Sequence, residues 1–132
     1  MNPTIGDVKT TLVEARAFVE KGWTQMHLAR RKDGSACSVI DESAREWCMG
    51  GALQAAAHKL FSLQDHPAFT GARTIIDRTL LGVLPKGNRV ALSDWNDVPG
   101  RKQKEVLAIF DKAIEMTKEE EATWTRLSIA RF

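Results

Sequence analysis

The sequence has no tyrosine, only two cysteines and no apolar run longer than a few residues. Such short runs support neither a membrane-spanning helix nor a secretory signal, so we expect a cytoplasmic protein without a membrane partner. The spacing of Cys37 and Cys48 matches no common zinc or redox motif, and we expect no disulfide between them. An excess of one charge is also lacking, because 19 Lys and Arg against 17 Asp and Glu leave a net charge of +2. This balance excludes a surface committed as a whole to nucleic acid or anionic lipid, so any anion site must be local.

We expect residues 1–132 to form a single domain, because 132 residues with 43% hydrophobic side chains suit one globular core. Apolar residues recur at helical spacing in four segments, which predicts a mainly α fold, a compact bundle of four main helices. These segments are residues 4–21, 41–63, 67–84 and a last one from about residue 100 through residue 121. For residues 123–132 the pattern does not decide between a helical turn, an edge strand and a docked tail.

The connections between these helices carry weaker signals. Asp33-Gly34 predicts a turn, and the alternation of apolar and polar residues between Trp23 and Ser38 predicts a small β-hairpin around it. Residues 85–89 contain the proline and glycine that break the third helix. Residues 90–95 then form a short apolar connection or a single helical turn.

The segment 41–63 is the predicted central helix, because apolar or very small residues cover most of its circumference. Its successive glycines, Gly50 and Gly51, each cost about 1 kcal/mol relative to alanine inside a helix. Tight packing explains this cost if another element approaches the backbone there. We therefore expect Gly51→Leu to destabilise the fold by overpacking.

Two sequence motifs, in a fixed order along the chain, are the most distinctive part of the sequence. The first is Trp47-Cys48-Met49-Gly50-Gly51-Ala52-Leu53, and the second is Trp95-Asn96-Asp97-Val98-Pro99-Gly100-Arg101 with Glu105-Val106-Leu107. Together with Glu20-Lys21-Gly22-Trp23-Thr24-Gln25, they resemble a family of small bacterial and phage proteins classed as a domain of unknown function. The likeness covers a core of about residues 8–117 and leaves 118–132 as a carboxyl-terminal tail. It implies one compact domain and brings no established activity.

The chain departs from this family at two places. Family members often carry Thr or Ser three residues before the Glu, as in a capping box, but Lys102 stands there, so we expect that cap to be missing. Trp124 and Phe132 lie in the tail, outside the likeness, and are candidates for self-association into a homo-oligomer.

The absence of a catalytic motif favours a non-enzymatic binding or accessory protein that needs no cofactor. The resemblance points to a phage-encoded protein, and small phage proteins often act by occupying a host protein, such as a component of antiviral defence. We therefore expect a host protein, or a second copy of this chain, as the partner.

The main alternative is a site for a phosphate-bearing small molecule or nucleotide signal at the start of the last helix. Cations there oppose the helix macrodipole at a cost of about 0.3 to 1 kcal/mol each, and a bound anion would reverse that cost. Exposed, screened lysines are the simpler explanation. The predicted ligand-binding residues are Trp95, Gly100, Arg101, Lys102 and Lys104.

Catalytic and metal sites are less favoured. A small hydrolase could use Asp94 and Asp97 beside Trp95, but turn and helix-cap chemistry explains both carboxylates. Cys48 and His58 cannot form a nucleophile and base pair within one helix, because ten residues span about 15 Å. No metal is predicted, because the possible ligands lack the spacing of zinc sites. These ligands are His27, Cys37, Cys48, His58 and His66.

Overall fold

The computed structural model describes residues 4–130, with side chains as far as Ala122. It is mainly helical with a small two-stranded sheet, which confirms the predicted fold class. The elements are α1 (Ile5–Lys21), β1 (Ala29–Arg31), β2 (Ala44–Trp47), α2 (Met49–Phe61), α3 (Pro67–Val83), α4 (Leu92–Asn96) and α5 (Gln103–Ala130). The short apolar connection predicted before Trp95 is the single-turn helix α4.

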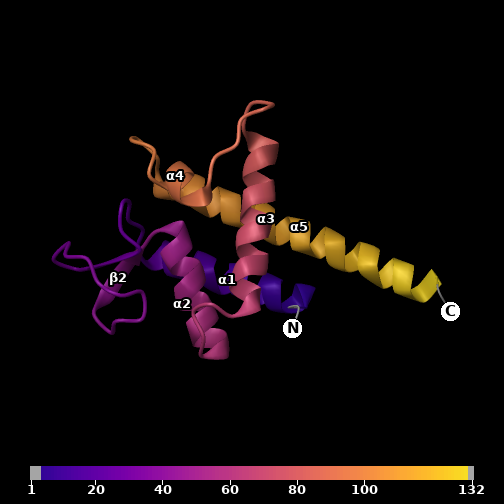
Figure 1. The fold of residues 1–132 in the computed structure, drawn as a ribbon, viewed down its shortest axis with the longest axis horizontal. Helices are drawn as coiled ribbons and strands as arrows, with labels where there is room; N and C mark the ends of the chain where they lie inside the picture. The colour runs from indigo at the N-terminus through magenta and orange to yellow at the C-terminus, as the bar shows by residue number, and fades with distance from the viewer. Residues whose placement is uncertain (1–3, 131–132) are drawn as a thin grey trace.

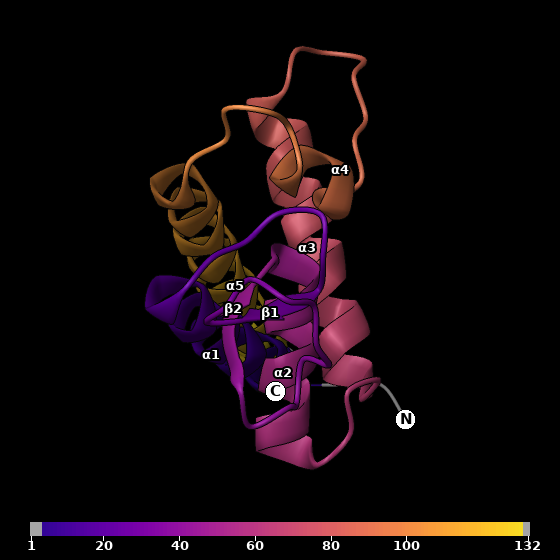
Figure 2. The same cartoon turned by 90° about the vertical axis from the view of Figure 1, so that its left-hand side faces the viewer.

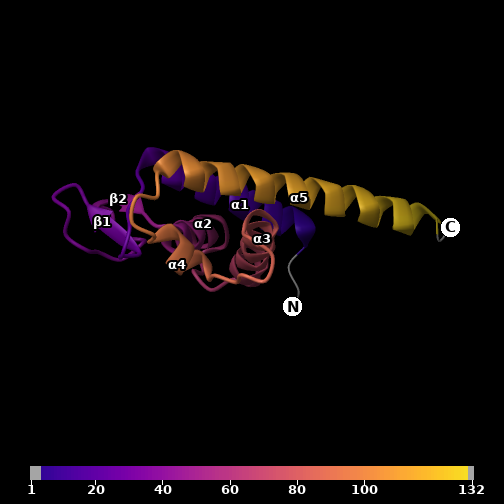
Figure 3. The same ribbon diagram turned by 90° about the horizontal axis from the view of Figure 1, so that it is seen from above.

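The helices form two layers. Figure 1 shows α1 and α5 side by side and antiparallel. Figure 3 shows α2, α3 and α4 together on one side of that pair. α5 has 28 residues and α1 has 17, so at 1.5 Å per residue α5 is longer by about 17 Å. The carboxyl-terminal part of α5 therefore extends past the other elements (Figures 1 and 3).

The core lies between the two layers. The 4-3-4 spacing predicted for the first helix is confirmed, because Val8, Leu12, Ala15 and Val19 are all buried. The stripe predicted on the last helix is confirmed in the same way, with Val106, Phe110 and Ala113 fully buried. Burial of a large apolar side chain contributes about 1.5–3 kcal/mol. The largest core side chains of α2 and α3 are Met49, Leu53, Ile76 and Leu80.

The predicted helix over residues 41–63 was wrong at its start. α2 begins at Met49, and Ala44–Trp47 instead forms strand β2, which pairs antiparallel with β1. The acidic start predicted from Asp41 is a turn, in which the Asp41 carboxylate accepts the N–H and hydroxyl of Ser43 at 2.8 and 2.5 Å. These bonds hold the pKa of Asp41 below its ordinary value. An Asp that binds a neighbouring backbone N–H can begin a turn as well as a helix.

The predicted turn at Asp33-Gly34 is confirmed. Gly34 has a φ of +88°, and its N–H donates to the Arg31 carbonyl at 2.9 Å. Beyond this turn, Ala36 bridges back to Arg30 in an antiparallel manner. The strand that pairs with β1 in the sheet, however, is β2. Figure 2 shows the two strands side by side at the end of the molecule that faces the viewer.

As for the tail, the helical state was one of the options left open, and the backbone is helical through Ala130. The side chain of Trp124, and the whole of Phe132, lie outside the described residues. Self-association through them stays a prediction.

Candidate functional site

Asn96, the last residue of α4, is completely buried and makes four side-chain hydrogen bonds. Its Oδ1 accepts the indole N–H of Trp23 at 2.8 Å and the backbone N–H of Met49 at 3.2 Å. Its Nδ2 donates to the Thr24 carbonyl at 3.2 Å and to Oδ1 of Asp97 at 3.0 Å. One amide therefore joins the segment after α1, the start of α2 and the end of α4.

Two neighbours complete this connection. Oδ1 of Asp97 also accepts the backbone N–H of Met26 at 2.9 Å. Nε2 of Gln25 donates to the carbonyls of Asn96 and Val98, both at 2.9 Å. We call the side chains of Trp23, Gln25, Asn96 and Asp97 the clamp, because they fix residues 23–26 to residues 96–98.

The clamp holds Met26 in an unusual conformation. Met26 has a φ of +72°, in the left-handed region, which costs a residue other than glycine about 1 kcal/mol or more. The hydrogen bond from its N–H to Asp97 compensates for part of that cost. Its side chain is 71% exposed, the largest fraction among the exposed large apolar residues in the described part of the chain.

Val98, within the second clamped segment, is 40% exposed, and Leu28, two residues after the first clamped segment, is 49% exposed. We call Met26, Leu28 and Val98 the apolar tip. Single exposed apolar side chains are normal on a protein surface. What sets the apolar tip apart is that hydrogen bonds from distant parts of the chain fix its backbone: Asp97 accepts the Met26 N–H, Gln25 donates to the Val98 carbonyl, and Cys48 donates to the Leu28 carbonyl.

The start of α2 packs against the backbone of Leu28. The carbonyl of Leu28 accepts the N–H of Cys48 at 3.2 Å, and a Cβ at Gly51 would overlap that carbonyl. A Cβ at Gly50 would instead have ordinary contact, with Leu92 at 3.7 Å. The predicted close approach is therefore confirmed at Gly51 and not at Gly50.

Cys48 is the N-cap of α2 and is buried, as a small core residue would be. Its Sγ accepts the N–H of Gly51 at 3.3 Å. Burial raises the pKa of the Cys48 thiol above its ordinary value. A protonated, inaccessible thiol is a poor nucleophile, so its role here is structural.

The structure brings two predicted ligand-binding residues together, but they bind each other. Trp95 is buried, and the guanidinium carbon of Arg101 lies 3.8 Å from the centroid of its ring. Nε of Arg101 donates to the Trp95 carbonyl at 3.0 Å, and Nη1 lies 3.1 Å from the Glu105 carboxylate. Arg101 therefore covers a face of the Trp95 indole, where a ligand of that residue would have stacked.

Glu105 shows that the expected loss of the helix cap was wrong in part. Its Oε1 accepts the backbone N–H of Lys102 at 2.9 Å, which is the glutamate half of a capping box. This bond, and then Arg101, hold the pKa of Glu105 below its ordinary value. The start of α5 thus already has a carboxylate from its own chain at one of its N–H groups.

The remaining predicted ligand residues stay on the surface. Gly100 is exposed with a φ of +84°, and Lys102 and Lys104 are exposed. The anion site stays a prediction, with these three residues as its accessible part. For the hydrolase alternative, Asp94 is exposed whereas Asp97 belongs to the clamp, so the two carboxylates have different surroundings.

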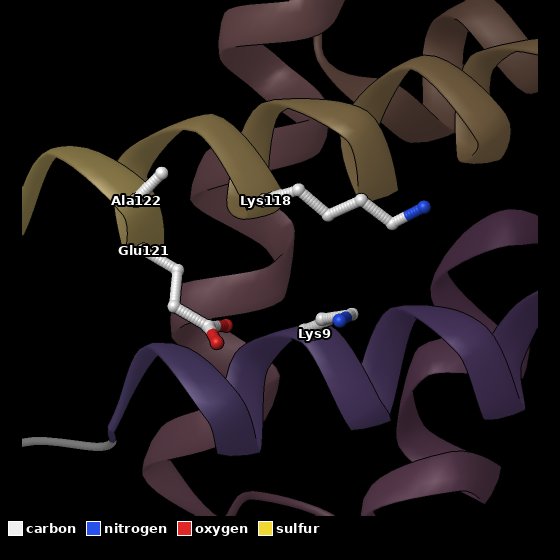
Figure 4. A pocket seen from close by; sticks show the side chains of 4 residues that line it. All are labelled: Lys9, Lys118, Glu121 and Ala122. Atoms are coloured by element: carbon white, nitrogen blue, oxygen red, sulfur yellow. The ribbon is translucent and has the colours of Figure 1, made fainter. Parts of the chain in front are cut away.

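The pockets lie elsewhere. A groove of about 350 Å³ between α1 and α5 is lined by Lys9, Lys118, Glu121 and Ala122 (Figure 4). A second pocket, of about 380 Å³, lies where α1, α2 and the residues before β2 meet. Neither is lined by a predicted site residue. Among the described residues, no three His, Cys, Asp or Glu side chains group as metal ligands, and no helix has the length and apolarity to cross a membrane.

Comparison with known proteins assigns the chain to a family. The model of a family of unknown function, DUF6197, matches residues 3–116. The chain belongs to this family. The matched range includes every residue of the clamp and of the apolar tip, and ends within α5. No curated protein and no solved structure matches the chain.

Sequence reasoning missed Gln25 and Met26 as members of the site. The available signal was Trp23-Thr24-Gln25, which already formed part of the family resemblance. Its meaning needed the pairing of Trp23 with Asn96, 73 positions away.

Proposed function

We propose that this protein is a non-enzymatic binding protein that occupies a partner protein with its apolar tip. The observation that carries this proposal is Met26, which is 71% exposed and held in a left-handed conformation by Asp97. Three polar groups of the second motif are engaged within the chain. Asn96, Asp97 and Arg101 each bond to other parts of the protein.

The apolar tip suits a protein partner for energetic reasons. A methionine side chain is flexible and polarizable, so it adapts to an apolar surface. Burial of such a side chain contributes about 1.5–3 kcal/mol. Because the clamp has already ordered the backbone of Met26, binding loses less conformational entropy than it would with a free loop.

A phage origin, and a host protein such as a defence component as the partner, belong to this proposal. Their support is the family resemblance, in which small phage proteins recur. A partner of this kind has to be captured before it can be named.

A comparison of matched variants in a capture experiment tests the proposal. We would immobilise the wild-type protein, Met26→Lys and Leu63→Lys, and identify what each retains from a host lysate. Leu63 is 54% exposed and follows the carboxyl end of α2, whereas Leu28 contacts its amino end, about 20 Å away for 13 residues. Both substitutions are on exposed side chains, and thermal unfolding verifies that each variant folds.

The proposal predicts a protein retained by the wild type and by Leu63→Lys that Met26→Lys loses by about tenfold or more. Equal retention by all three proteins would contradict it. A protein lost from both variants to the same degree would also contradict it, because the apolar tip would then have no special role.

A second candidate is a phosphate-bearing small molecule or nucleotide at the start of α5. The exposure of Lys102 and Lys104, next to Gly100, favours it. The bond of Glu105 to the Lys102 N–H disfavours it, because a ligand would have to displace that carboxylate.

A further inference from the structure

The three methionines whose side chains are described differ in their exposure to solvent. Met26 is 71% exposed, whereas Met49 is completely buried. Met116 is partly buried against the core, and its sulfur accepts the Thr79 hydroxyl at 3.1 Å. Oxidation of methionine depends on access to the sulfur lone pairs.

We propose that Met26 is an oxidation site for peroxides and that its sulfoxide prevents binding by the apolar tip. In this reaction the sulfur lone pair attacks one peroxide oxygen, an S–O bond forms and the O–O bond breaks. The sulfur then carries a hydroxyl, whose proton passes to the leaving hydroxide, so the products are the sulfoxide and water. Sulfur loses two electrons and the peroxide gains them.

The modification changes the surface and leaves the fold in place. The Met26 side chain lies in solvent, and the clamp holds this residue through its backbone N–H. A sulfoxide there introduces no buried polar group. It replaces an apolar side chain by a strongly hydrated one, which opposes burial against an apolar partner surface. Methionine sulfoxide reductases reverse this change, so the site can act as a switch.

The cysteines do not compete under suitable conditions. The thiolate is the form that reacts with peroxide, and burial raises the pKa of Cys48. Cys37 is partly exposed, so a Cys37→Ser background removes it from the experiment. The raised pKa keeps the Cys48 thiol protonated at pH 5, and the thioether reaction needs no ionisation.

Peptide mapping by mass spectrometry tests the site itself. The full chain in the Cys37→Ser background is treated with hydrogen peroxide at pH 5, and sulfoxide at each methionine is followed with time. We expect Met26 to react about tenfold or more faster than Met49 and Met116, with the thermal midpoint unchanged once Met26 is converted. Equal rates at Met26 and Met116, or unfolding as Met26 reacts, would overturn the proposal.

The effect on binding rests on the proposed function and is measured separately. Treated wild type, untreated wild type and treated Met26→Leu serve as baits, since leucine preserves the apolar volume. We expect only the treated wild type to lose the partner. If it retains the partner while Met26→Lys loses it, the switch is wrong and the proposed function stands. If Met26→Lys retains the partner, the proposed function fails, and the mapping still decides whether Met26 is the oxidation site.

Discussion

The indole N–H of Trp23 donates to the side-chain oxygen of Asn96 at 2.8 Å, across 73 positions of the chain. The same oxygen accepts the N–H of Met49. The three segments that carry the family resemblance therefore meet at one buried amide. The two motifs therefore share a structural role, which is to join these segments through Asn96. The proposed function is that the segments so joined carry the apolar tip.

Asn96→Ala should strongly destabilise the protein. It would leave the Trp23 indole N–H, the Met49 N–H and the Thr24 carbonyl without their partner in a buried site. Unsatisfied buried groups cost about 1–3 kcal/mol each, so we expect a loss of about 3 kcal/mol or more in the free energy of unfolding. Chemical denaturation measures this loss, and a loss below about 1 kcal/mol would show that water replaces the amide.

Asn96→Asp separates the acceptor from the donor of this amide. The aspartate keeps the oxygen, but it places a second carboxylate about 3 Å from Asp97, where the Nδ2 donor now lies. Burial and the like charge should raise the pKa of the new group. We expect this variant to be less stable than wild type at pH 7 and to recover part of the difference as the pH falls to 5. A difference that does not vary with pH would contradict this account.

The two glycines of α2 should respond in opposite ways to alanine. Gly51→Ala places a Cβ into the Leu28 carbonyl, so we expect a loss of about 1–3 kcal/mol, and a larger one for Gly51→Leu. Gly50→Ala has space, and its lower backbone entropy when unfolded should stabilise by about 0.5 kcal/mol. Thermal unfolding of both variants, compared with the wild type, measures the two changes in stability. Similar losses would mean that the approach of Leu28 is not specific to Gly51.

Glu105 should contribute to the acid sensitivity of the fold. Its pKa is lowered below the ordinary value of 4.5, so the unfolded chain binds a proton more readily than the folded one. Its stabilisation is present above pH 4.5 and is lost as the pH falls through the folded pKa. In denaturation curves from pH 6 to 3, Glu105→Gln should be less stable than wild type at pH 6, and the gap should narrow toward pH 3. A constant gap would contradict the shift.

The anion prediction needs a variant that keeps the fold. Arg101→Glu is unsuitable, because Arg101 packs on Trp95 and bonds to its carbonyl. Lys102→Glu with Lys104→Glu removes two exposed cations instead. If nucleotides bind at the start of α5, calorimetry should show wild-type binding that this double variant weakens about tenfold or more. No binding by the wild type at millimolar nucleotide would end the proposal.

Local patterns predicted those elements whose burial repeats along one helix. The stripes of α1 and α5 were read correctly because side chains three and four residues apart share a helix face. Residues 41–47 were misread because Asp41 bonds Ser43 in a turn that mimics a helix start, while β2 is stabilised by pairing with β1. Strand pairing between distant segments leaves little trace in local sequence.

The site was predictable in composition more than in geometry. Trp95 and Arg101 were correctly placed near each other, since they are six positions apart across a turn. The sequence did not predict that the Glu105 carboxylate would accept the Lys102 N–H, because a bound anion could have accepted the same N–H. The N–H of Met26, a residue in the left-handed region, bonds to Asp97, 71 positions away, and a contact over that distance leaves no local signal.

The central claim is that Asp97 holds Met26 in place, and amide hydrogen exchange at Met26 tests it most directly. Asp94→Ala is the matched control, because Asp94 is exposed on α4, the short helix that Asp97 caps. We predict slow exchange of the Met26 N–H in the wild type and in Asp94→Ala, and faster exchange by about tenfold or more in Asp97→Ala, which removes the acceptor. Equal exchange rates at Met26 in all three proteins would contradict the claim.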